Sequence, residues 1–195
     1  MCLWRLNGIE GEAQVFMIIV VTGTPGTGKS TLAESLAKIA GARLIGANDI
    51  IREGRLYSGI EPDGTLVAKM SMLAAELRRL ARRQGNAVLD GHLLCEIRIS
   101  GAVCIVVREH LGILEKRLAK RGYSKNKIWE NLVAEAVDYC GERSKSNYTH
   151  VFEVFSGIEA KKVLDIIKNK RRMEEIELLD ELLPFVKRYY KRMVR

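Results

Sequence analysis

One eight-residue segment, Gly-Thr-Pro-Gly-Thr-Gly-Lys-Ser from Gly23 to Ser30, restricts what this chain of 195 residues can fold into more than any other. It matches the phosphate-binding pattern Gly-x-x-x-x-Gly-Lys-Ser/Thr in full. An unbroken apolar run, Phe16 to Val21, precedes it, and apolar residues at helical spacing follow it from Lys29 to Ala40. A buried strand, a glycine-rich turn and a helix in this order predict an α/β protein with a phosphate-binding loop.

Each residue type in this segment has a physical role at a phosphate group. Glycines let backbone N–H groups turn inward and approach phosphate oxygens closely. The helix that begins at Lys29 directs the positive end of its dipole at the same anion. The Lys29 ammonium neutralises phosphate charge, and the Ser30 hydroxyl is a ligand for Mg²⁺. The alternative is a glycine-rich turn that binds no nucleotide, and the complete motif in this context argues against it.

The rest of the chain alternates short apolar runs with helical patterns. We expect further strands at 42–45, 87–89, 102–107 and 149–155, and helices at 49–55, 65–84, 110–120, 127–144 and 158–169. Residues 57–64 are rich in turn formers and predict a loop. Five short strands that alternate with helices imply an α/β fold, with a parallel sheet covered by helices on both faces. A chain of this length is expected to form one domain with a sizeable core.

The expected domain with the phosphate-binding loop runs from residue 17 to residue 169. Residues 1–16 are expected to be a flexible extension, or an upstream start that the cell does not use, because Met17 stands where the first strand begins. Residues 170–195 change to a basic, amphipathic character and predict an added helix or helix pair. The end of this tail, Lys187–Arg195, holds five cations and no acid. Contact with RNA and a solvated helix end both remain open for it.

Composition excludes several classes of protein. No apolar run approaches the ~20 residues that a membrane helix needs, and the first residues lack the pattern of a signal peptide. The four cysteines lie far apart, which is typical of reduced thiols in a reducing compartment. We therefore expect a cytoplasmic protein with no membrane partner. The formal net charge of +8 suggests polyanionic partners such as nucleotides or RNA.

A second candidate group follows the expected strand at 87–89. Asp90 stands at the carboxyl end of this strand, which faces the ligand crevice in an open α/β sheet. A phosphate-binding loop needs an acidic residue at that position to hold Mg²⁺, so we expect Asp90 to act with Ser30, through a bound water. The alternative is an aspartate that only shapes an Asp-Gly turn. His92 lies two residues further on, and taken alone it is better explained as a surface or capping histidine.

With these residues identified, the sequence resembles the adenylate kinase isoenzyme 6 family, also called coilin-interacting nuclear ATPase proteins, and above all its archaeal members. The resemblance covers about residues 18–168. Beyond the phosphate-binding segment it rests on Asp49-Ile-Ile-Arg-Glu53, Asp90-x-His92 and Arg117-Leu-Ala-Lys-Arg-Gly-Tyr123, followed by Asn131 and Glu135 at the family's spacing. The phosphate-binding segment alone indicates only a large superfamily. The other motifs restrict the resemblance to this one family and disfavour shikimate and gluconate kinases.

The resemblance implies the fold of a P-loop nucleoside monophosphate kinase with a five-stranded parallel sheet. In such a kinase the monophosphate-binding segment would lie at about 46–69 and a short lid at about 120–130. The C-terminal helical tail is extra, because the resemblance does not cover it. It implies the Mg-ATP-dependent reaction ATP + AMP = 2 ADP, together with ATPase activity. It also implies a role in small ribosomal subunit and rRNA maturation, with a small-subunit ribosomal protein and pre-rRNA as partners. The alternative is a nucleotide-switched ribosome assembly ATPase with little genuine AMP kinase activity.

The resemblance also assigns site residues, position by position. ATP binding falls to Gly26, Gly28, Lys29, Ser30, Thr31 and Arg121. Asp49 and Arg52 fall in the monophosphate-binding segment, where Arg52 would hold the monophosphate. The expected catalytic residues are Lys29, Asp90, His92 and Arg121. Physical chemistry supports this set, because a transferred phosphoryl group carries charge on three oxygens and must be surrounded by cations. A solvated basic helix face is the alternative for Arg121, and a lone surface arginine is the alternative for Arg52.

The sequence departs from the family's eukaryotic members at three places. One is residues 93–98, Leu-Leu-Cys-Glu-Ile-Arg, where those members have an aromatic, acidic stretch. Gly91 stands where those members carry a tyrosine, and residues 156–158 lack the lysine that contacts adenine in them. The acceptor is therefore AMP or another nucleoside monophosphate. A short lid excludes water less well than a long one, so hydrolysis is expected to compete with transfer. His92 is the candidate to position the attacking water.

Overall fold

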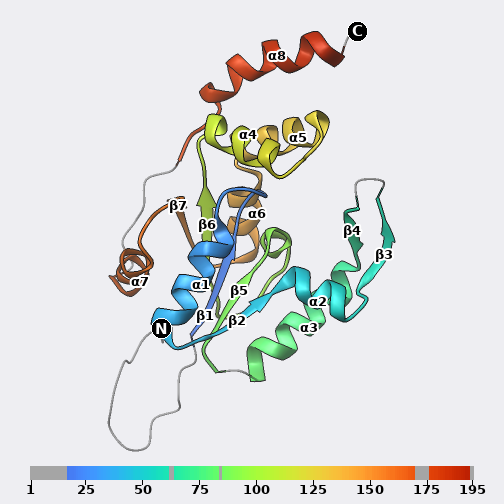
Figure 1. Ribbon diagram of the computed structural model, residues 1–195. Helices are drawn as coiled ribbons and strands as arrows, with labels where there is room; N and C mark the ends of the chain where they lie inside the picture. Colours follow the sequence, from blue (N-terminus) through green and yellow to red (C-terminus); the bar gives the residue numbers. More distant parts are fainter. Residues whose placement is uncertain (1–16, 62–63, 84, 170–175, 194–195) are drawn as a thin grey trace, which may run out of the picture.

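A five-stranded parallel sheet forms the centre of the molecule (Figure 1). The computed structural model describes residues 17–61, 64–83, 85–169 and 176–193, so the expected extension at 1–16 and residues 170–175 lie outside it. The order of the strands across the sheet is β2 (Arg43–Gly46), β5 (Ala87–Asp90), β1 (Ile18–Thr22), β6 (Val103–Arg108) and β7 (His150–Phe155). The expected parallel sheet of an α/β fold is confirmed, with each strand within two residues of its expected bounds.

The central strands bring the phosphate-binding segment to one edge of the sheet. Strands β1 and β6 consist of buried apolar residues over nearly their whole length, as a parallel strand covered on both faces requires. In the register of the sheet, Val21 of β1 lies beside Asp90 of β5 and Ile105 of β6. The carboxyl ends of three neighbouring strands therefore meet where the glycine-rich segment begins, which is where open α/β sheets bind ligands.

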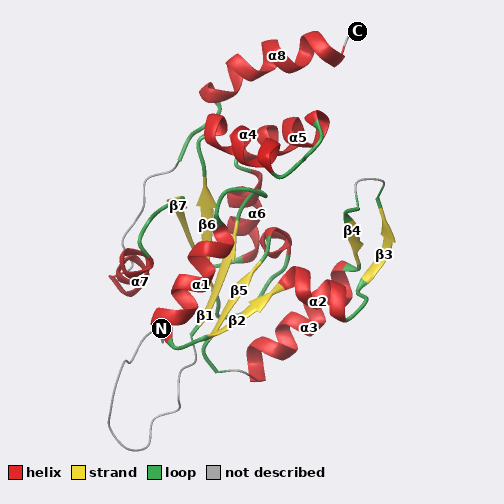
Figure 2. Cartoon of the chain, viewed as in Figure 1, coloured by secondary structure: helices red, strands yellow, loops and turns green. Residues whose placement is uncertain are grey.

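Helices cover both faces of the sheet (Figure 2). On one face, α1 (Lys29–Ala40) and α7 (Ala160–Asn169) pack their apolar residues on the strands; Leu36 and Ile167, for example, share a core with Ile19. On the other face, Leu73 and Leu77 of α3 (Met70–Arg83) lie in the larger core. The short 3-10 helix η1 (His92–Glu96) and α6 (Tyr139–Asn147) complete this second face. Two apolar cores thus hold the sheet from both sides.

The segment between α2 (Ala47–Glu53) and α3 is a β-hairpin, which corrects the expectation of a loop at 57–64 and a helix at 65–84. Strands β3 (Tyr57–Ile60) and β4 (Leu66–Ala68) pair in antiparallel fashion. At the turn, the Gly64 amide donates to the Glu61 carbonyl over 2.8 Å, and Gly64 has a φ of 84°. A glycine tolerates this left-handed backbone, so the turn closes the hairpin, and the helix begins only at Met70.

The expected helix at 127–144 is two helices, α5 (Lys125–Ala136) and α6, which is a second correction. The break lies at Asp138, a non-glycine residue with a left-handed φ of 52°. Its carboxylate accepts a hydrogen bond from the Gly141 amide over 3.1 Å and so caps α6. Aspartate favours helix caps over helix interiors, and this local hydrogen bond competes with continuation of α5.

A third apolar cluster joins α4 (Leu111–Lys120) and α5 to the C-terminal part of the chain, which forms the 3-10 helix η2 (Asp180–Leu182) and α8 (Leu183–Met193). Only four residues, 121–124, connect α4 to α5. None of the helices in the described ranges is long and apolar enough to cross a membrane.

Candidate active site

The glycine-rich segment forms the turn between β1 and α1, and its three glycines are required by geometry. Gly23, Gly26 and Gly28 have φ values of 142°, 97° and 90°. Space is also restricted, because a Cβ atom at Gly23 would collide with the Val107 carbonyl, and one at Gly26 would lie 2.8 Å from Leu114 Cδ1. Glycine alone combines this backbone conformation with this close approach. The turn leaves its amides at the N-terminus of α1, where an anion is favoured.

Side chains from distant parts of the chain hold this turn in place. The Thr24 hydroxyl donates to the Glu135 carboxylate of α5. The Thr27 hydroxyl donates to the Thr24 carbonyl over 3.0 Å, and Arg117 Nη1 of α4 donates to the Gly26 carbonyl over 3.2 Å. The turn is therefore preorganised by a hydrogen bond within it and by hydrogen bonds from α4 and α5. Sequence reasoning missed these bracing roles, because Thr24 and Glu135 lie 111 positions apart.

Lys29 shares one electrostatic environment with two other expected site residues. Burial lowers the pKa of the Lys29 ammonium, the Asp90 carboxylate raises it, and the Arg121 guanidinium lowers it again. These effects require the three charged groups to lie near one another at the carboxyl edge of the sheet. The structure thus brings together Lys29, Asp90 and Arg121, which come from α1, β5 and the end of α4.

Asp90 ends β5 and faces the start of α1. Burial raises the pKa of the Asp90 carboxyl, and the nearby Ser30 hydroxyl and Lys29 ammonium lower it by less. One carboxylate oxygen, Oδ1, is buried and has no hydrogen-bond partner within the described residues. A buried oxygen without a partner is costly unless a ligand satisfies it. Ser30 and Thr31, in the first turn of α1, are exposed at the mouth of this site.

His92 lies one residue beyond the Asp90-Gly91 pair, at the start of η1. Its backbone carbonyl accepts hydrogen bonds from the Thr22 hydroxyl and the Cys95 thiol, each over 3.2 Å. The imidazole is half-buried, and burial, reinforced by the charges of Lys29 and Lys127, lowers its pKa from 6.5 to about 4. His92 is therefore a neutral imidazole at physiological pH, able to accept or donate a hydrogen bond without adding charge.

We expect the His92 imidazole to titrate near pH 4, against an ordinary pKa of 6.5. Because the folded state binds this proton less well than the unfolded state, protonation opposes folding; His92 costs no stability above pH 6.5 and an increasing amount as the pH falls toward 4. The measurement is an NMR titration of the imidazole signals, assigned by comparison with His92→Gln. The same signal in urea should titrate near the ordinary value. A midpoint near 6.5 in the native protein would contradict the prediction.

The other expected site residues lie at the rim of the crevice. Arg121 caps the C-terminus of α4, its amide donates to the Arg117 and Leu118 carbonyls, and its side chain is exposed. Asp49 stands in the first turn of α2, close enough to raise the pKa of Asp90 by its charge. Arg52 is exposed in the last turn of α2, and within the described residues no hydrogen bond or ion pair holds its side chain. The structure thus brings Asp49 toward Asp90 but shows no contact of Arg52 with the phosphate-binding turn.

Gly91, one of the departures from the eukaryotic pattern, has a structural reason. A Cβ atom at Gly91 would lie 2.7 Å from the Cβ of Ala47 at the start of α2. The absence of a side chain lets α2 pack directly against the end of β5. This close packing places the segment that carries Asp49 next to the phosphate-binding turn.

A buried charge network lies behind the site. Arg108 ends β6 and is almost fully buried, with Nε 3.1 Å from Glu135 Oε1 and Nη1 2.8 Å from Glu153 Oε2. Its Nη1 also lies 2.6 Å from Asp138 Oδ1. Burial raises the pKa of Asp138 to about 7 although Arg108 lowers it. The Glu109 amide also donates to Glu135 over 2.9 Å, so this network ties β6, β7 and α5 to the phosphate-binding turn.

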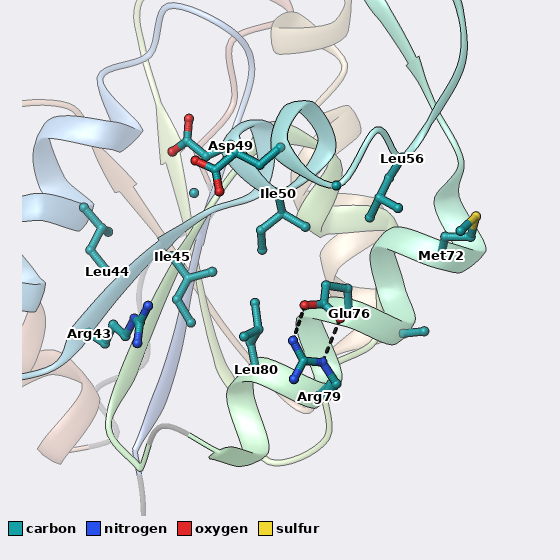
Figure 3. A pocket seen from close by; sticks show the side chains of 14 residues that line it. Arg43, Leu44, Ile45, Asp49, Ile50, Leu56, Met72, Glu76, Arg79 and Leu80 are labelled. Atoms are coloured by element: carbon teal, nitrogen blue, oxygen red, sulfur yellow. Dashed lines mark hydrogen bonds and ion pairs between the residues drawn. The ribbon is translucent and has the colours of Figure 1, made fainter.

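A hollow in the described residues lies along the outer edge of β2, between α2 and α3 (Figure 3). It has a volume of about 740 Å³. Ile45, Ile50 and Leu80 point into it, and the paired side chains of Glu76 and Arg79 form one wall. Asp49 also lines this hollow, but none of the residues from Gly23 to Thr31 does, so we assign the phosphate site by its chemistry to the carboxyl edge of the sheet.

Comparisons with known proteins agree with this geometry. Residues 19–138 match the family model described as "AAA domain". A protein of Pyrococcus abyssi (strain GE5 / Orsay) with the name "Putative adenylate kinase" is 33% identical over 181 residues, which cover 88% of this chain and 98% of that protein. A protein of the same name from Pyrococcus furiosus is also 33% identical over 181 residues, with the same coverage.

Solved structures with a similar fold include two shikimate kinases. The enzyme from Acinetobacter baumannii, in complex with shikimate, superposes with a TM-score of 0.59 at 15% identity, over 82% of this chain and 97% of that one. The enzyme from Bacteroides thetaiotaomicron gives a TM-score of 0.56 at 14% identity, over 80% and 98%. At this identity the likeness shows the fold alone, and it confirms the expected P-loop kinase fold.

Proposed function

Since this chain belongs to the AAA domain family and has archaeal relatives that carry the name adenylate kinase, we propose that it is a nucleoside monophosphate kinase that catalyses ATP + AMP = 2 ADP. The phosphate-binding turn and the P-loop kinase fold make it a nucleotide-dependent phosphotransferase. The observation that carries the finer assignment is the shared environment of Lys29, Asp90 and Arg121, which arises from three separate elements.

Phosphoryl transfer requires positioning and charge neutralisation more than covalent chemistry. In this proposal the amides from Gly26 to Thr31 bind the ATP phosphates, and Lys29 neutralises the charge on the β- and γ-phosphates. Arg121, at the end of α4, would reach the transferred group from the opposite side of the crevice. An arginine suits this role because its guanidinium can bind a phosphate through two parallel hydrogen bonds.

The residues at the mouth of the site fit a magnesium ion. Asp90 offers a buried oxygen without a partner, and the Ser30 hydroxyl stands beside it. Within the described ranges no cluster of three or more acidic, histidine or cysteine side chains could hold a metal alone. Mg²⁺ with few protein ligands is typically completed by water and phosphate oxygens. We propose that Ser30, and Asp90 through a water, hold Mg²⁺, which would neutralise charge on the β- and γ-phosphates.

The monophosphate acceptor is proposed to lie between α2 and the phosphate-binding turn. Arg52 would hold its phosphate, which the absence of an ion pair at this side chain among the described residues supports. Asp49, near Asp90, would face the same ligand. The base is left open between AMP and other monophosphates.

A competing ATPase activity belongs to the proposal. The lid connection between α4 and α5 is only four residues long, so a closed lid covers little of the crevice. The neutral His92 imidazole near Lys29 is suited to accept a hydrogen bond from an attacking water. These two features favour the second candidate, a nucleotide-switched ATPase.

The motifs around Asp90 and Arg121 support the further proposal that the chain is a member of the adenylate kinase isoenzyme 6 family. In this proposal it acts in the cytoplasm, and its partners are a small-subunit ribosomal protein and pre-rRNA.

A coupled assay of ADP formation from Mg-ATP, with and without AMP, tests the proposal. We expect AMP to raise the rate several-fold, because transfer to a bound acceptor avoids the poor positioning of water. CMP, GMP and UMP in place of AMP measure the base preference, and shikimate serves as a control acceptor that should give no stimulation. A rate that none of the monophosphates raises would favour the switch ATPase instead.

A further inference from the structure

Helix α4 lies against the phosphate-binding turn on one of its sides. Leu114 Cδ1 and Leu118 Cδ2 stand 2.8 and 3.1 Å from the position that a Cβ of Gly26 would occupy. From the same helix, Arg117 donates to the Gly26 carbonyl over 3.2 Å. Arg121 follows at the helix end. The placement of α4 therefore determines where both arginines stand relative to the nucleotide phosphates.

The tail segment, residues 176–189, packs on another side of α4 and on α5. Figure 1 shows α8 on the side of these two helices that faces away from the sheet. Phe185 and Tyr189 of α8 are each only 7% exposed and share an apolar cluster with Leu111 of α4 and Ile128 of α5. The Tyr189 ring also stacks on the Trp129 ring of α5, with centroids 5.2 Å apart and an interplanar angle of 20°. The two helices that flank the lid connection are thus clamped together from outside.

Hydrogen bonds and ion pairs also join the tail segment to α4. Glu181 Oε2 accepts a hydrogen bond from the Leu111 amide over 2.9 Å, and Oε1 lies 2.6 Å from His110 Nδ1. The N-cap residue of α4, His110, supplies no side-chain cap of its own, so the tail segment caps this helix. Further along, Arg188 Nη1 lies 2.7 Å from Glu115 of α4. The beginning and the middle of α4 are both tied to the tail segment.

We propose that the tail segment is a positioning element for the lid, with Phe185 as its anchoring residue. It holds α4 and α5 as one frame, so that Arg117 and Arg121 stand at the phosphate-binding turn when ATP is bound. This inference rests on the proposed function for the role of Arg121 at the transferred group. None of these tail residues touches the reacting atoms; they act through α4.

The competing explanation is that Phe185 and Tyr189 only cover an apolar face of α4 and α5. Such a cover would affect stability and leave kinetic constants unchanged in the folded protein. A positioning role predicts more, because a displacement of about 1 Å in a charged group can cost about 10²-fold in rate. The two explanations therefore separate in kinetic constants measured well below the unfolding temperature.

The test uses Phe185→Ala in the full chain, with Phe185→Leu as conservative variant and Ile167→Ala as matched control. Ile167 lies buried in α7, in the core on the other face of the sheet. For Phe185→Ala we expect kcat for AMP-dependent ADP formation to fall by about tenfold or more. The ratio of the ATP hydrolysis rate without AMP to the rate of transfer to AMP should rise. Phe185→Leu should recover most of the rate. Ile167→Ala should lower the thermal midpoint and keep its kinetic constants.

Two outcomes would overturn the proposal: wild-type kinetic constants in folded Phe185→Ala, or the same kinetic change in Ile167→Ala. Glu181→Ala is the second variant, since it removes the cap of α4 without opening the core. It should also raise the ratio of hydrolysis to transfer, and an unchanged ratio would count equally against the proposal.

Failure of the proposed function is distinguishable from failure of this inference. If AMP does not stimulate the wild-type protein, the proposed acceptor is wrong. The positioning role of the tail segment is then tested by the affinity of each variant for a non-hydrolysable ATP analogue. Phe185→Ala should weaken this binding several-fold and Ile167→Ala should not. Equal affinities in both variants would reject a positioning role whatever reaction the protein catalyses.

Discussion

Replacing Lys29 by methionine is expected to lower kcat for ADP formation by about 10³-fold. The methionine keeps most of the length and apolar volume of the lysine and removes its charge. Lys29 shares its environment with Asp90 and Arg121, and burial already lowers its pKa. A cation in such a partly dry site stabilises the charge of the transferred phosphoryl group far more than one in water does. Steady-state rates with saturating Mg-ATP, with and without AMP, measure the loss.

The control for this prediction is Lys38→Met, in the exposed last turn of the same helix. It removes the same charge without approaching the site, so its rate should equal that of the wild type. The thermal midpoint of Lys29→Met should not fall, because the change removes a charge whose burial is unfavourable. If Lys29→Met kept a tenth or more of the rate, the assignment of the phosphate-binding turn as the catalytic centre would be wrong.

The second large effect is on stability. Arg108→Met is expected to lower the free energy of unfolding by about 3–5 kcal/mol. Arg108 is 1% exposed and lies within 3.1 Å of carboxylates from Glu135, Asp138 and Glu153. Removing the guanidinium leaves the buried Glu135 carboxylate without its ion-pair partner. Asp138 and Glu153 keep only Lys145, whose Nζ lies 3.8 Å and 3.4 Å from their carboxylate oxygens. Urea denaturation at pH 8 measures the loss.

The pH dependence of this effect has a definite sign. Burial raises the pKa of Asp138 to about 7 in the folded protein, so the folded state binds that proton more tightly than the unfolded state does. Asp138 therefore opposes folding most strongly above pH 7, and this cost is relieved as the pH falls from about 7 toward 4. Because Arg108 lowers the pKa of Asp138, Arg108→Met should raise that pKa further. The part of the stability difference that arises from Asp138 should therefore shrink as the pH falls toward about 7 and stay constant below it.

An exposed arginine provides the matched comparison for Arg108→Met. Arg143 forms an ion pair with Glu96 over 2.7 Å, but its side chain is 53% exposed. Surface ion pairs contribute little because water screens them. Arg143→Met should cost a small fraction of the loss in Arg108→Met. Equal losses in the two variants would mean that the buried network does not depend on its central charge.

The parts of the fold that could be predicted are those in which local pattern and tertiary packing agree. The helix expected from Lys29 to Ala40 has these same bounds, because its apolar spacing and its glycine-rich start both favour a helix there. Two assignments were wrong, and both lie where local signals were ambiguous. One was the loop at 57–64 followed by a helix at 65–84, and the other was the single helix at 127–144. A hairpin turn at Gly64 and a left-handed Asp138 decided these segments.

The same distinction applies to the candidate site. Lys29 and Ser30 belong to one contiguous motif, and Asp90 follows a recognisable strand, so residue types and spacing were sufficient to propose them. Arg108 carries no local signal, because its importance arises from partners on other elements. The spacing of Glu135 matched the family, but its hydrogen bond with Thr24 is visible only in the structure. The role of Arg52 stays a prediction, since in the described structure its side chain contacts no other site residue.

By itself, the sequence determined that this chain is an α/β protein with a phosphate-binding turn, because glycine conformation, helix dipole and strand burial act within a few neighbouring residues. The tertiary structure alone decided how that turn is supported. Glu135, 111 positions away from Thr24, holds it, and so does helix α4, which a tail 70 or more positions away caps and covers. Hydrogen bonds and apolar contacts depend on distance in space. Their pairing across the chain is therefore visible only once the strands and helices have assembled.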